Sequence, residues 1–163
     1  GATDAVTVIA AMRRGQNVNT EDVFGVGINP QGGAYPGTFC LASTVDAGTD
    51  NAGFTSQGNP GGAPSFARAA STSVATNYVV TGIADISADT CTARRNGVQI
   101  QSTATDQGSG GWGVYDAYLG ARAGSSRFFN GRLYALIVVN RILTAGELAG
   151  AEAWAASKCG ITL

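Results

Sequence analysis

Short apolar or alternating runs, separated by turns rich in glycine, recur along the first two thirds of the chain. Runs of this kind, bounded by Gly, Pro, Asn, Asp and Ser, are typical of β-strands joined by tight turns. The strands predicted in this way cover residues 5–14, 22–29, 38–43, a short segment around Phe54, and residues 65–70, 77–86, 90–95 and 98–103. Many short strands with turn signals between them indicate an all-β sandwich or barrel.

Alternation is clearest in residues 22–29, because successive side chains of a strand point to opposite faces of the sheet. Phe24, Val26 and Ile28 fall on one face and are predicted to point into the core. Val23 falls on the opposite face together with two glycines, which would let another backbone approach closely.

Residues 77–103 predict a three-stranded antiparallel meander. A turn around Ala88 joins its first two strands, and Asn96-Gly97 reverses the chain before the third. An Asn-Gly pair suits a two-residue hairpin turn because both residues tolerate positive φ. We therefore expect a firm register in this part of the sheet.

The stretch from residue 128 to residue 148, FFNGRLYALIVVNRILTAGEL, combines a turn, a strand and the start of a helix. The Asn-Gly pair near its start predicts the turn. Residues 133–139 carry no charge and are rich in Leu, Ile and Val, which favours a strand buried on both faces. Thr144 and Glu147 have the spacing of a capping box, in which the two side chains satisfy each other's backbone N–H groups.

The helix predicted at residues 145–158 is rich in alanine and ends before Gly160, a residue suited to the C′ position. At 100° per residue, one face carries the residues predicted to pack on the sheet: Leu148, Ala151, Ala155 and Cys159. Trp154 lies at the edge of this face and is predicted to anchor the packing.

Three motifs follow one another near the C-terminus: LG at 119–120, FNGRL at 129–133, and RILT at 141–144 followed by Glu147-Leu148. Their order and spacing resemble the closing segment of laminin-G-like jelly-roll domains. Residues 78–100, YVVTGIADISADTCTARRNGVQI, resemble the strands and the NG turn that precede this segment in the same superfamily, the concanavalin A-like lectins and glucanases. The resemblance implies an all-β fold, a two-sheet antiparallel jelly-roll sandwich with one C-terminal α-helix.

The end of the helix adds a closer likeness. Glu152, Trp154, Lys158 and Gly160 match the E-x-W-x-x-x-K-x-G ending of versions appended to bacteriophage tail and virion proteins. This resemblance implies a location in the virion, assembly in the host cytoplasm and contacts with other virion protein chains. Because such appendages are often trimers, it also implies a homo-oligomer, a trimer.

The length of 163 residues predicts a single domain spanning residues 1–163, large enough to bury a proper core. Only 13% of the residues are charged, and the formal net charge is −1. Nucleic-acid binding by phosphate neutralisation needs a clustered basic surface, so we expect no nucleic-acid partner. The two basic doublets, Arg13-Arg14 and Arg94-Arg95, are predicted to be solvated strand ends.

No segment reaches the roughly 18 apolar residues of a membrane-spanning helix, so we expect no membrane insertion, and no signal-peptide pattern is present. Because the sequence starts at Gly1 rather than Met, we expect a fragment or a processed part of a longer chain. Cys40, Cys91 and Cys159 are scattered and odd in number, which argues against a disulfide framework and a zinc site. They are predicted to be buried free thiols.

Residues 46–64 form the least regular region, in which oxygen-bearing side chains lie among glycines. Calcium takes oxygen ligands at loosely defined geometry, so Asp46, Asp50 and Asn51 are weak calcium candidates. The alternative is that these residues form Asx turns. No other cofactor is expected.

Residues 106–118, DQGSGGWGVYDAY, combine aromatic and carboxylate side chains in a predicted rim loop. Proteins bind sugars by stacking aromatic rings on their C–H faces and by hydrogen-bonding their hydroxyls to carboxylates and amides. The ligand-binding candidates are Trp112, Tyr115, Asp106, Gln107 and Asp116. Trp112 has two interpretations, since it either stacks on a sugar or caps the open end of the sandwich. Tyr118 is expected to point into the core.

Catalytic chemistry finds little support in the sequence. The chain has no histidine, which removes Ser-His-Asp and Cys-His nucleophile systems and most transition-metal sites. It also lacks the E-x-D-x-E run of the glucanase branch, which would place an acid and a nucleophile about 5 Å apart. We therefore expect a non-enzymatic module that recognises carbohydrate on the host surface. The alternatives are a structural domain that decorates or oligomerises a virion protein without a ligand, and a glycosidase-derived domain.

Overall fold

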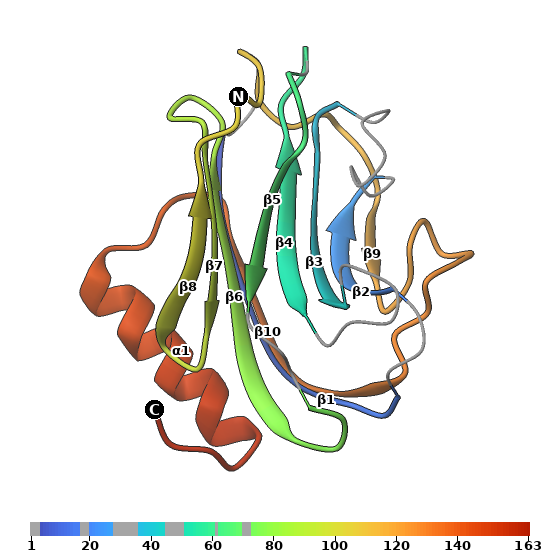
Figure 1. The fold of residues 1–163 in the computed structure, drawn as a ribbon, viewed down its shortest axis with the longest axis vertical. Helices are drawn as coiled ribbons and strands as arrows, with labels where there is room; N and C mark the ends of the chain where they lie inside the picture. Colours follow the sequence, from blue (N-terminus) through green and yellow to red (C-terminus); the bar gives the residue numbers. More distant parts are fainter. Residues whose placement is uncertain (1–3, 17–19, 28–35, 45–50, 61, 70–72) are drawn as a thin grey trace.

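A computed structural model describes residues 4–16, 20–27, 36–44, 51–60, 62–69 and 73–163. Within these residues the chain forms two five-stranded antiparallel sheets that pack face to face, with one helix outside them (Figure 1). This confirms the predicted fold class, an all-β jelly-roll sandwich with a C-terminal helix.

The two sheets draw their strands from both halves of the chain. The first sheet contains, in spatial order, β10 (Gly131–Val139), β1 (Ala5–Arg14), β6 (Asn77–Asp85), β7 (Thr90–Arg95) and β8 (Val98–Thr103). The second contains β5 (Ser65–Ala69), β4 (Ala52–Gln57), β3 (Thr38–Thr44), β2 (Glu21–Val26) and β9 (Ala117–Leu119). The short strand expected around Phe54 is therefore a full member of the second sheet. Ile28, expected in the core, lies outside the described residues.

β1 is buried on both of its faces. Val8, Ala10 and Met12 belong to the core between the two sheets, whereas Ile9 and Ala11 belong to the layer under α1 (Ala145–Lys158). The backbone of β1 is also paired along both edges, with β10 on one side and β6 on the other. A run of apolar residues without clean alternation fits a strand in this position.

β10 packs against apolar clusters on both faces, as its sequence predicted, but most of its residues are only partly buried. It lies at the edge of the first sheet, only Ala135 is fully buried, and Val138 is 44% exposed. Periodicity indicates which residues are apolar, but it does not show whether a strand has one neighbour or two. That position is set by the pairing of β10 with β1.

The two sheets approach closely where Phe54 of β4 lies over Gly82 of β6. A Cβ atom at Gly82 would overlap the ring of Phe54, so only glycine leaves room for this contact. The centroid of the Phe39 ring lies 5.9 Å from that of Phe54, and the centroid of the Phe24 ring lies 6.2 Å from that of Phe39. Val23, predicted on the opposite face of its strand, is also in this core because β2 is bulged there.

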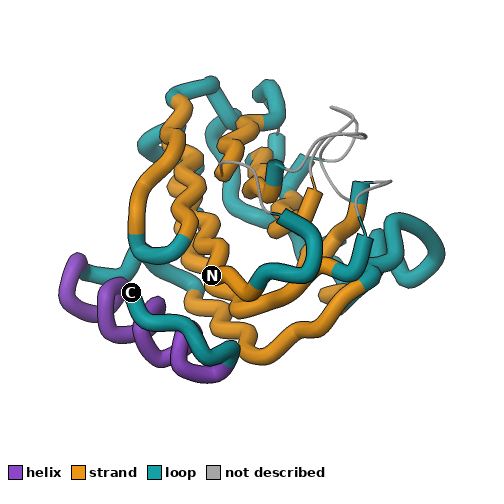
Figure 2. Tube along the Cα trace, turned by 60° about the horizontal axis from the view of Figure 1, so that its bottom comes forward, coloured by secondary structure: helices purple, strands orange, loops and turns teal. Residues whose placement is uncertain are grey.

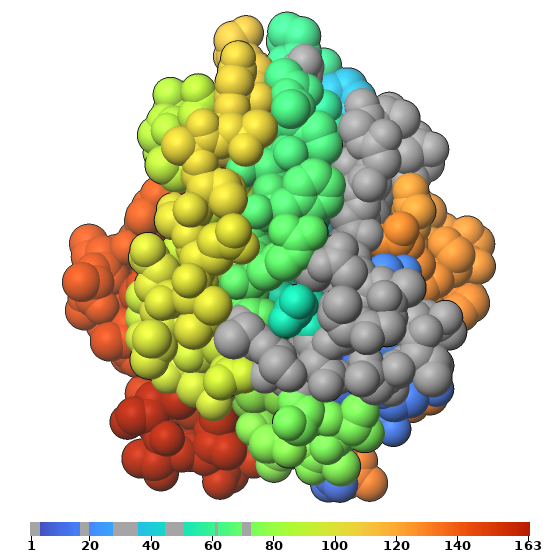
Figure 3. Space-filling view, viewed as in Figure 1, coloured from blue at the N-terminus to red at the C-terminus, as the bar shows by residue number. Residues whose placement is uncertain are grey.

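Contacts between β5 and β8 close one side of the sandwich. The hydroxyl oxygens of Ser65 and Thr103 lie 2.7 Å apart, and the backbone N–H of Arg68 donates to Gln101 Oε1 at 2.6 Å. Figure 3 shows the two strands forming one continuous surface. On the opposite side, residues 120–130 project beyond β9 (Figure 1).

The meander predicted at residues 77–103 is confirmed as β6, β7 and β8. Asn96 has φ 48° and Gly97 has φ 79°, the positive values that a type I′ turn requires. Asn96 Oδ1 also accepts a hydrogen bond from the backbone N–H of Val79 at 2.8 Å. One irregularity was not expected, since the register of β7 and β8 shifts between Ala93 and Arg94.

α1 starts with the predicted capping box. The backbone N–H of Glu147 donates to Thr144 Oγ1 at 3.4 Å, and the backbone N–H of Thr144 donates to Glu147 Oε2 at 2.9 Å. Leu148, Ala155 and Cys159 are buried in the layer between the helix and the first sheet. Figure 2 shows the helix lying along the outer face of that sheet.

Trp154 does not anchor the helix, contrary to the prediction. Its side chain is 49% exposed, and Lys158 Nζ lies 4.9 Å from the centroid of its ring. The anchor is Glu152, which is buried and accepts hydrogen bonds from Thr81 Oγ1 and from Arg94 Nε, each at 2.8 Å. A buried carboxylate needs partners of this kind, and here they come from β6 and β7.

The prediction of solvated strand ends is wrong for Arg14 and Arg94. Arg94 pairs with Glu152 across the helix–sheet interface. Arg14 is fully buried, and its Nη2 donates to the carbonyl oxygen of Gln16 at 3.1 Å. The pair between Arg94 and Glu152 joins residues 58 apart in the chain, so the basic doublet alone does not indicate it.

The three cysteines are buried and free, as predicted. Burial raises the pKa of the Cys91 thiol to about 12, so this thiol stays neutral at physiological pH. No helix among the described residues is long and apolar enough to cross a membrane.

We expect the start of α1 and its buried face to contribute differently to stability. Replacing Thr144 by Ala removes the acceptor for one helical N–H group and should lower the free energy of unfolding by about 1 kcal/mol. Replacing Leu148 by Ala leaves a cavity between helix and sheet and should cost roughly 2–5 kcal/mol. Chemical denaturation of both variants measures the two values. Equal losses would contradict the docking of α1 on the sheet.

The capping box should also make stability depend on acid pH. The guanidinium of Arg141, followed by the backbone N–H of Thr144, lowers the pKa of Glu147 from 4.5 to about 2. The folded state therefore favours the carboxylate, and its contribution is complete above pH 4.5 and lost as the pH falls toward 2. Denaturation of the wild type and of Glu147→Gln at several pH values should show a stability difference that shrinks over this range. A difference that is constant from pH 6 to pH 2 would refute the assignment.

Candidate functional site

The loop between β8 and β9 crosses one end of the sandwich and contains all five predicted ligand-binding residues. Backbone hydrogen bonds tie it to the segment after β4, since Gly58 N–H donates to Gln107 O at 2.8 Å and Asn59 N–H donates to Gly110 O at 3.3 Å. A Cβ atom at Gly110 would overlap the Asn59 carbonyl, which explains a glycine there. The loop is therefore held by the protein at several points along its length.

Gln107 is one of these anchors. Its side chain is fully buried, and Nε2 donates to the carbonyl oxygen of Thr90 at 3.1 Å. Its backbone N–H donates to Asp89 Oδ1 at 2.9 Å. These bonds join the loop to the turn between β6 and β7, so the side chain of Gln107 serves the structure of the rim.

Trp112 lies in the main core. Its side chain is 8% exposed, and its ring meets that of Phe39 edge to face, with centroids 5.1 Å apart and an interplanar angle of 71°. This is the position that capping the end of the sandwich requires. An indole covered in this way does not offer a ring face to a sugar.

Tyr115 is the aromatic residue of the loop that faces solvent. Its side chain is 48% exposed, and its hydroxyl donates to the carbonyl oxygen of Pro36 at 3.3 Å. The ring lies against two glycines: a Cβ atom at Gly113 would be 2.5 Å from Tyr115 Cε2, and one at Gly27 would be 3.1 Å from Tyr115 Cδ2. The glycines make room for the ring, and the hydroxyl contact fixes its far end.

The two carboxylates of the loop are both exposed but occupy different parts of the rim. The backbone carbonyl of Asp116 accepts from Gly27 N–H at 2.9 Å, which places this residue beside the Tyr115 ring. Asp106 Oδ1 accepts from Gly108 N–H at 2.8 Å, and its carbonyl accepts from Ala63 N–H at 2.9 Å. The structure thus brings Tyr115 and Asp116 together and places Asp106 beside the segment that leads into β5.

Tyr118 is not in the core, contrary to the prediction. It is half-buried on β9, and a Cβ atom at Gly124 would lie 3.7 Å from Tyr118 Cδ1. β9 is a three-residue edge strand, and its pairing puts Tyr118 opposite Gly25 of β2. The alternation of β2 then turns Tyr118 away from the face that carries Phe24.

The calcium candidates are only partly described. Asn51 is half-buried just before β4, whereas Asp46 and Asp50 lie outside the described residues. In the part of the chain that the structure does describe, no group of three or more Cys, Asp or Glu residues is arranged to hold a metal ion.

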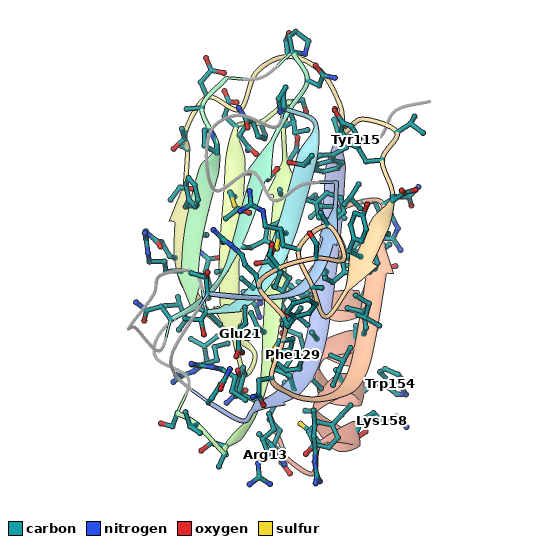
Figure 4. The ribbon with its side chains drawn as sticks, turned by 90° about the vertical axis from the view of Figure 1, so that its right-hand side faces the viewer. Arg13, Glu21, Tyr115, Phe129, Trp154 and Lys158 are labelled. Carbon is teal, nitrogen blue, oxygen red and sulfur yellow. The ribbon has the colours of Figure 1, made fainter. Side chains whose placement is uncertain are left out.

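A second cluster of polar residues, which the sequence analysis missed, lies at the opposite end of the sandwich. Figure 4 shows Tyr115 near the top of the molecule and Glu21 and Arg13 toward the bottom. Glu21 is buried, and its carboxylate accepts from Ser43 Oγ at 3.0 Å and from Gln16 Nε2 at 3.2 Å. The contact with Ser43 depends on the pairing of β2 with β3.

Asp22 is the second buried carboxylate of this cluster. Arg127 Nη1 lies 4.0 Å from its Oδ1. Burial, and then the nearby Asp22 carboxylate, raise the pKa of the Cys40 thiol well above its usual value. Cys40 is therefore a neutral thiol and not a nucleophile at physiological pH.

The two aromatic residues of the rim loop should respond differently to truncation. Trp112→Ala removes a core ring and should lower the free energy of unfolding by about 3–5 kcal/mol. Tyr115→Ala removes a half-exposed ring and should cost about 1 kcal/mol or less. Denaturant titration of both variants compares the two losses. A mild effect of Trp112→Ala would contradict its place in the core.

Comparison with known proteins supports the fold. No known family model matches the sequence, and no curated protein sequence is similar to it. The structure resembles the CBM40 module of the Ruminococcus gnavus IT-sialidase bound to α2,3-sialyllactose, with a TM-score of 0.67 and 19% identity over 93% of this chain and 84% of that chain. It also resembles the SAP-like pentraxin of Limulus polyphemus, with a TM-score of 0.64 and 15% identity over 98% and 72% of the two chains.

A larger protein contains a similar domain. The NanB sialidase of Streptococcus pneumoniae matches with a TM-score of 0.67 and 17% identity, over 90% of this chain but only 24% of the sialidase. At these identities the likeness concerns the fold. The chain has the fold of a two-sheet jelly-roll β-sandwich.

Proposed function

We propose that this domain is a non-enzymatic carbohydrate-binding module of a bacteriophage virion or tail protein, which recognises carbohydrate on the host surface. The observation that carries the proposal is the exposed ring of Tyr115, held against Gly27 and Gly113 and fixed by its hydroxyl contact with Pro36. A tyrosine held in this way offers an apolar ring to the C–H face of a sugar at little cost in side-chain entropy.

Polar groups beside the ring would orient the sugar. The exposed carboxylate of Asp116 follows Tyr115 directly and accepts hydrogen bonds from hydroxyl groups. Asp106 is exposed farther along the same rim and would contact a second residue of an oligosaccharide. The backbone of this rim is held by hydrogen bonds, so binding would order few groups.

Two likenesses support the partner and the context. The resemblance in fold to a carbohydrate-binding module bound to sialyllactose favours a glycan as the ligand. The resemblance of residues 152–160 to the helix ending of domains in bacteriophage tail and virion proteins favours a place in the virion, next to other virion chains, after assembly in the host cytoplasm.

The glutamates form ion pairs or hydrogen bonds within the protein, which supports a role without catalysis. Glu147 forms a two-point ion pair with Arg141, Glu152 pairs with Arg94, and Glu21 is buried beside Ser43. A glycosidase of this superfamily needs two carboxyl groups facing one sugar bond. We therefore expect no release of reducing sugar from host polysaccharide.

A structural role in the virion is the second candidate, and exposed apolar residues favour it. Leu119 is 61% exposed and Phe128 is 62% exposed, and the hydrogen bond from Phe129 N–H to Gly120 O brings their segments together. Apolar residues gathered at the surface often mark a contact with another chain. They would fit a homo-oligomer, a trimer, in which this side is covered.

The proposed site is tested by binding to an array of bacterial surface glycans. We expect Tyr115→Ala to weaken binding at least about tenfold, or 1.4 kcal/mol. Tyr115→Phe is the matched control, because it keeps the ring and loses only the hydroxyl contact, and it should retain most of the affinity.

Other outcomes would point elsewhere. Binding that survives Tyr115→Ala would place the glycan site away from the rim. If no glycan binds and light scattering shows a trimer, the structural role would replace the proposed one.

A further inference from the structure

Two arginines stand directly opposite each other at one end of the first sheet. Arg13 of β1 is the register partner of Arg132 of β10. Directly opposed residues of an antiparallel pair have Cβ atoms about 4.5–5.5 Å apart, on the same face of the sheet. Like charges in this position repel each other and destabilise the pairing.

The repulsion is not relieved by the acidic residues that the structure describes. Among these residues, Asp22 pairs with Arg127, Glu147 with Arg141 and Glu152 with Arg94, and none forms an ion pair with Arg13 or Arg132. The opposed pair is notable in a protein with only ten basic residues and a net charge of −1.

The pair borders a pocket of about 290 Å³. The residues that line it are Arg13, Arg14, Gly15, Asn130, Gly131 and Arg132. Gly131 cannot carry a side chain, because a Cβ atom there would overlap the Arg13 carbonyl oxygen, and one at Gly15 would lie 2.6 Å from Asn130 Oδ1. Both arginines of the opposed pair thus line one pocket, at a point where the backbones of the two segments pack closely.

A second pocket of about 400 Å³ is lined by residues that adjoin these two chain segments in the sequence. Gln16 follows β1, Thr20 precedes β2, and Arg127 and Phe128 precede β10. Phe128 is 62% exposed and offers an apolar ring at the rim of this pocket. We call the two pockets together the basic groove.

The chemistry of the basic groove fits an acidic sugar. A guanidinium has a planar set of donors that matches a carboxylate or a sulfate group. The amides of Gln16 and Asn130 suit hydroxyl groups, and the ring of Phe128 suits a C–H face. A nucleic acid is less well matched, since its binding depends on many phosphate contacts and the chain is weakly acidic overall.

We propose that the basic groove binds an acidic saccharide, whose carboxylate or sulfate group lies between Arg13 and Arg132. This site is distinct from the rim at Tyr115, because the two lie toward opposite ends of the molecule (Figure 4). It does not depend on the function proposed for Tyr115. The anion bridges two groups that otherwise repel each other, so its binding stabilises the pairing of β1 with β10.

Calorimetric titration at low salt tests the site with three tetrasaccharides of equal length: one built of uronic acids, one sulfated and one neutral. We expect the acidic compounds to bind and the neutral one not to bind, and the two acidic arms show which anionic group is preferred. Arg13→Gln and Arg132→Gln should each weaken binding at least about tenfold. Arg68→Gln makes the same charge change at an exposed position of β5 and should leave binding unchanged.

Thermal melting provides a readout that a structural role would not reproduce. Without ligand, Arg132→Gln should melt no lower than the wild type, because one of the opposed charges is gone. With the bound acidic tetrasaccharide, the wild type should gain melting temperature and the variant should not.

Several results would overturn the proposal. In the titration, they are binding of the neutral tetrasaccharide as tight as that of the acidic ones, wild-type affinity of both arginine variants, and binding that is lost only in Tyr115→Ala. In the melting experiment, it is a melting temperature of unliganded Arg132→Gln below that of the wild type. Binding lost only in Tyr115→Ala would instead assign the acidic sugar to the rim and support the function proposed there. A single-stranded oligonucleotide of equal charge that binds more tightly than both acidic saccharides would also overturn it, in favour of a nucleic-acid partner.

Discussion

The pairing of β1 between β6 and β10 is the constraint on which the rest of the structure depends. β10 runs along β1 from Thr7 opposite Val139 to Arg14 opposite Gly131, so the sheet joins the two ends of the chain. One face of β1 belongs to the core between the sheets, and the other lies under α1. The second sheet and the helix are therefore both positioned through this strand. Contacts of such long sequence separation form only after most of the chain has been brought together.

The two proposed binding regions lie toward opposite ends of the two-sheet sandwich. At the rim, Gln107, Gly110 and Gly113 hold a loop in which one aromatic ring is buried and another is exposed. At the other end, the pairing of β1 with β10 sets two arginines opposite each other and leaves a pocket between them. In both places glycines let two chain segments approach closely. A rigid support of this kind lowers the entropy that a ligand must overcome.

The helix shows how local and long-range information differ. The capping box at Thr144 was predictable because its donors and acceptors lie within four residues of each other. The role of Trp154 was predicted wrongly, because a large apolar residue at the edge of a helix face can turn toward solvent. Glu152 anchors the helix instead, with Thr81 and Arg94 as partners that are 71 and 58 residues away in the chain. No pattern along the helix itself indicates those partners.

The sequence by itself determined the strand rhythm, the Asn96-Gly97 turn, the helix with its cap and the free thiols, because these depend on the period of apolar residues, on the φ values that a residue tolerates and on composition. It also predicted a candidate site in the loop between β8 and β9 without separating Trp112 from Tyr115. Only the tertiary structure decided which of the two rings is buried, that β10 is an edge strand, and that Arg13 meets Arg132. The reason is that exposure and cross-strand contact belong to pairs of segments far apart in the chain, whereas a sequence pattern describes one segment at a time.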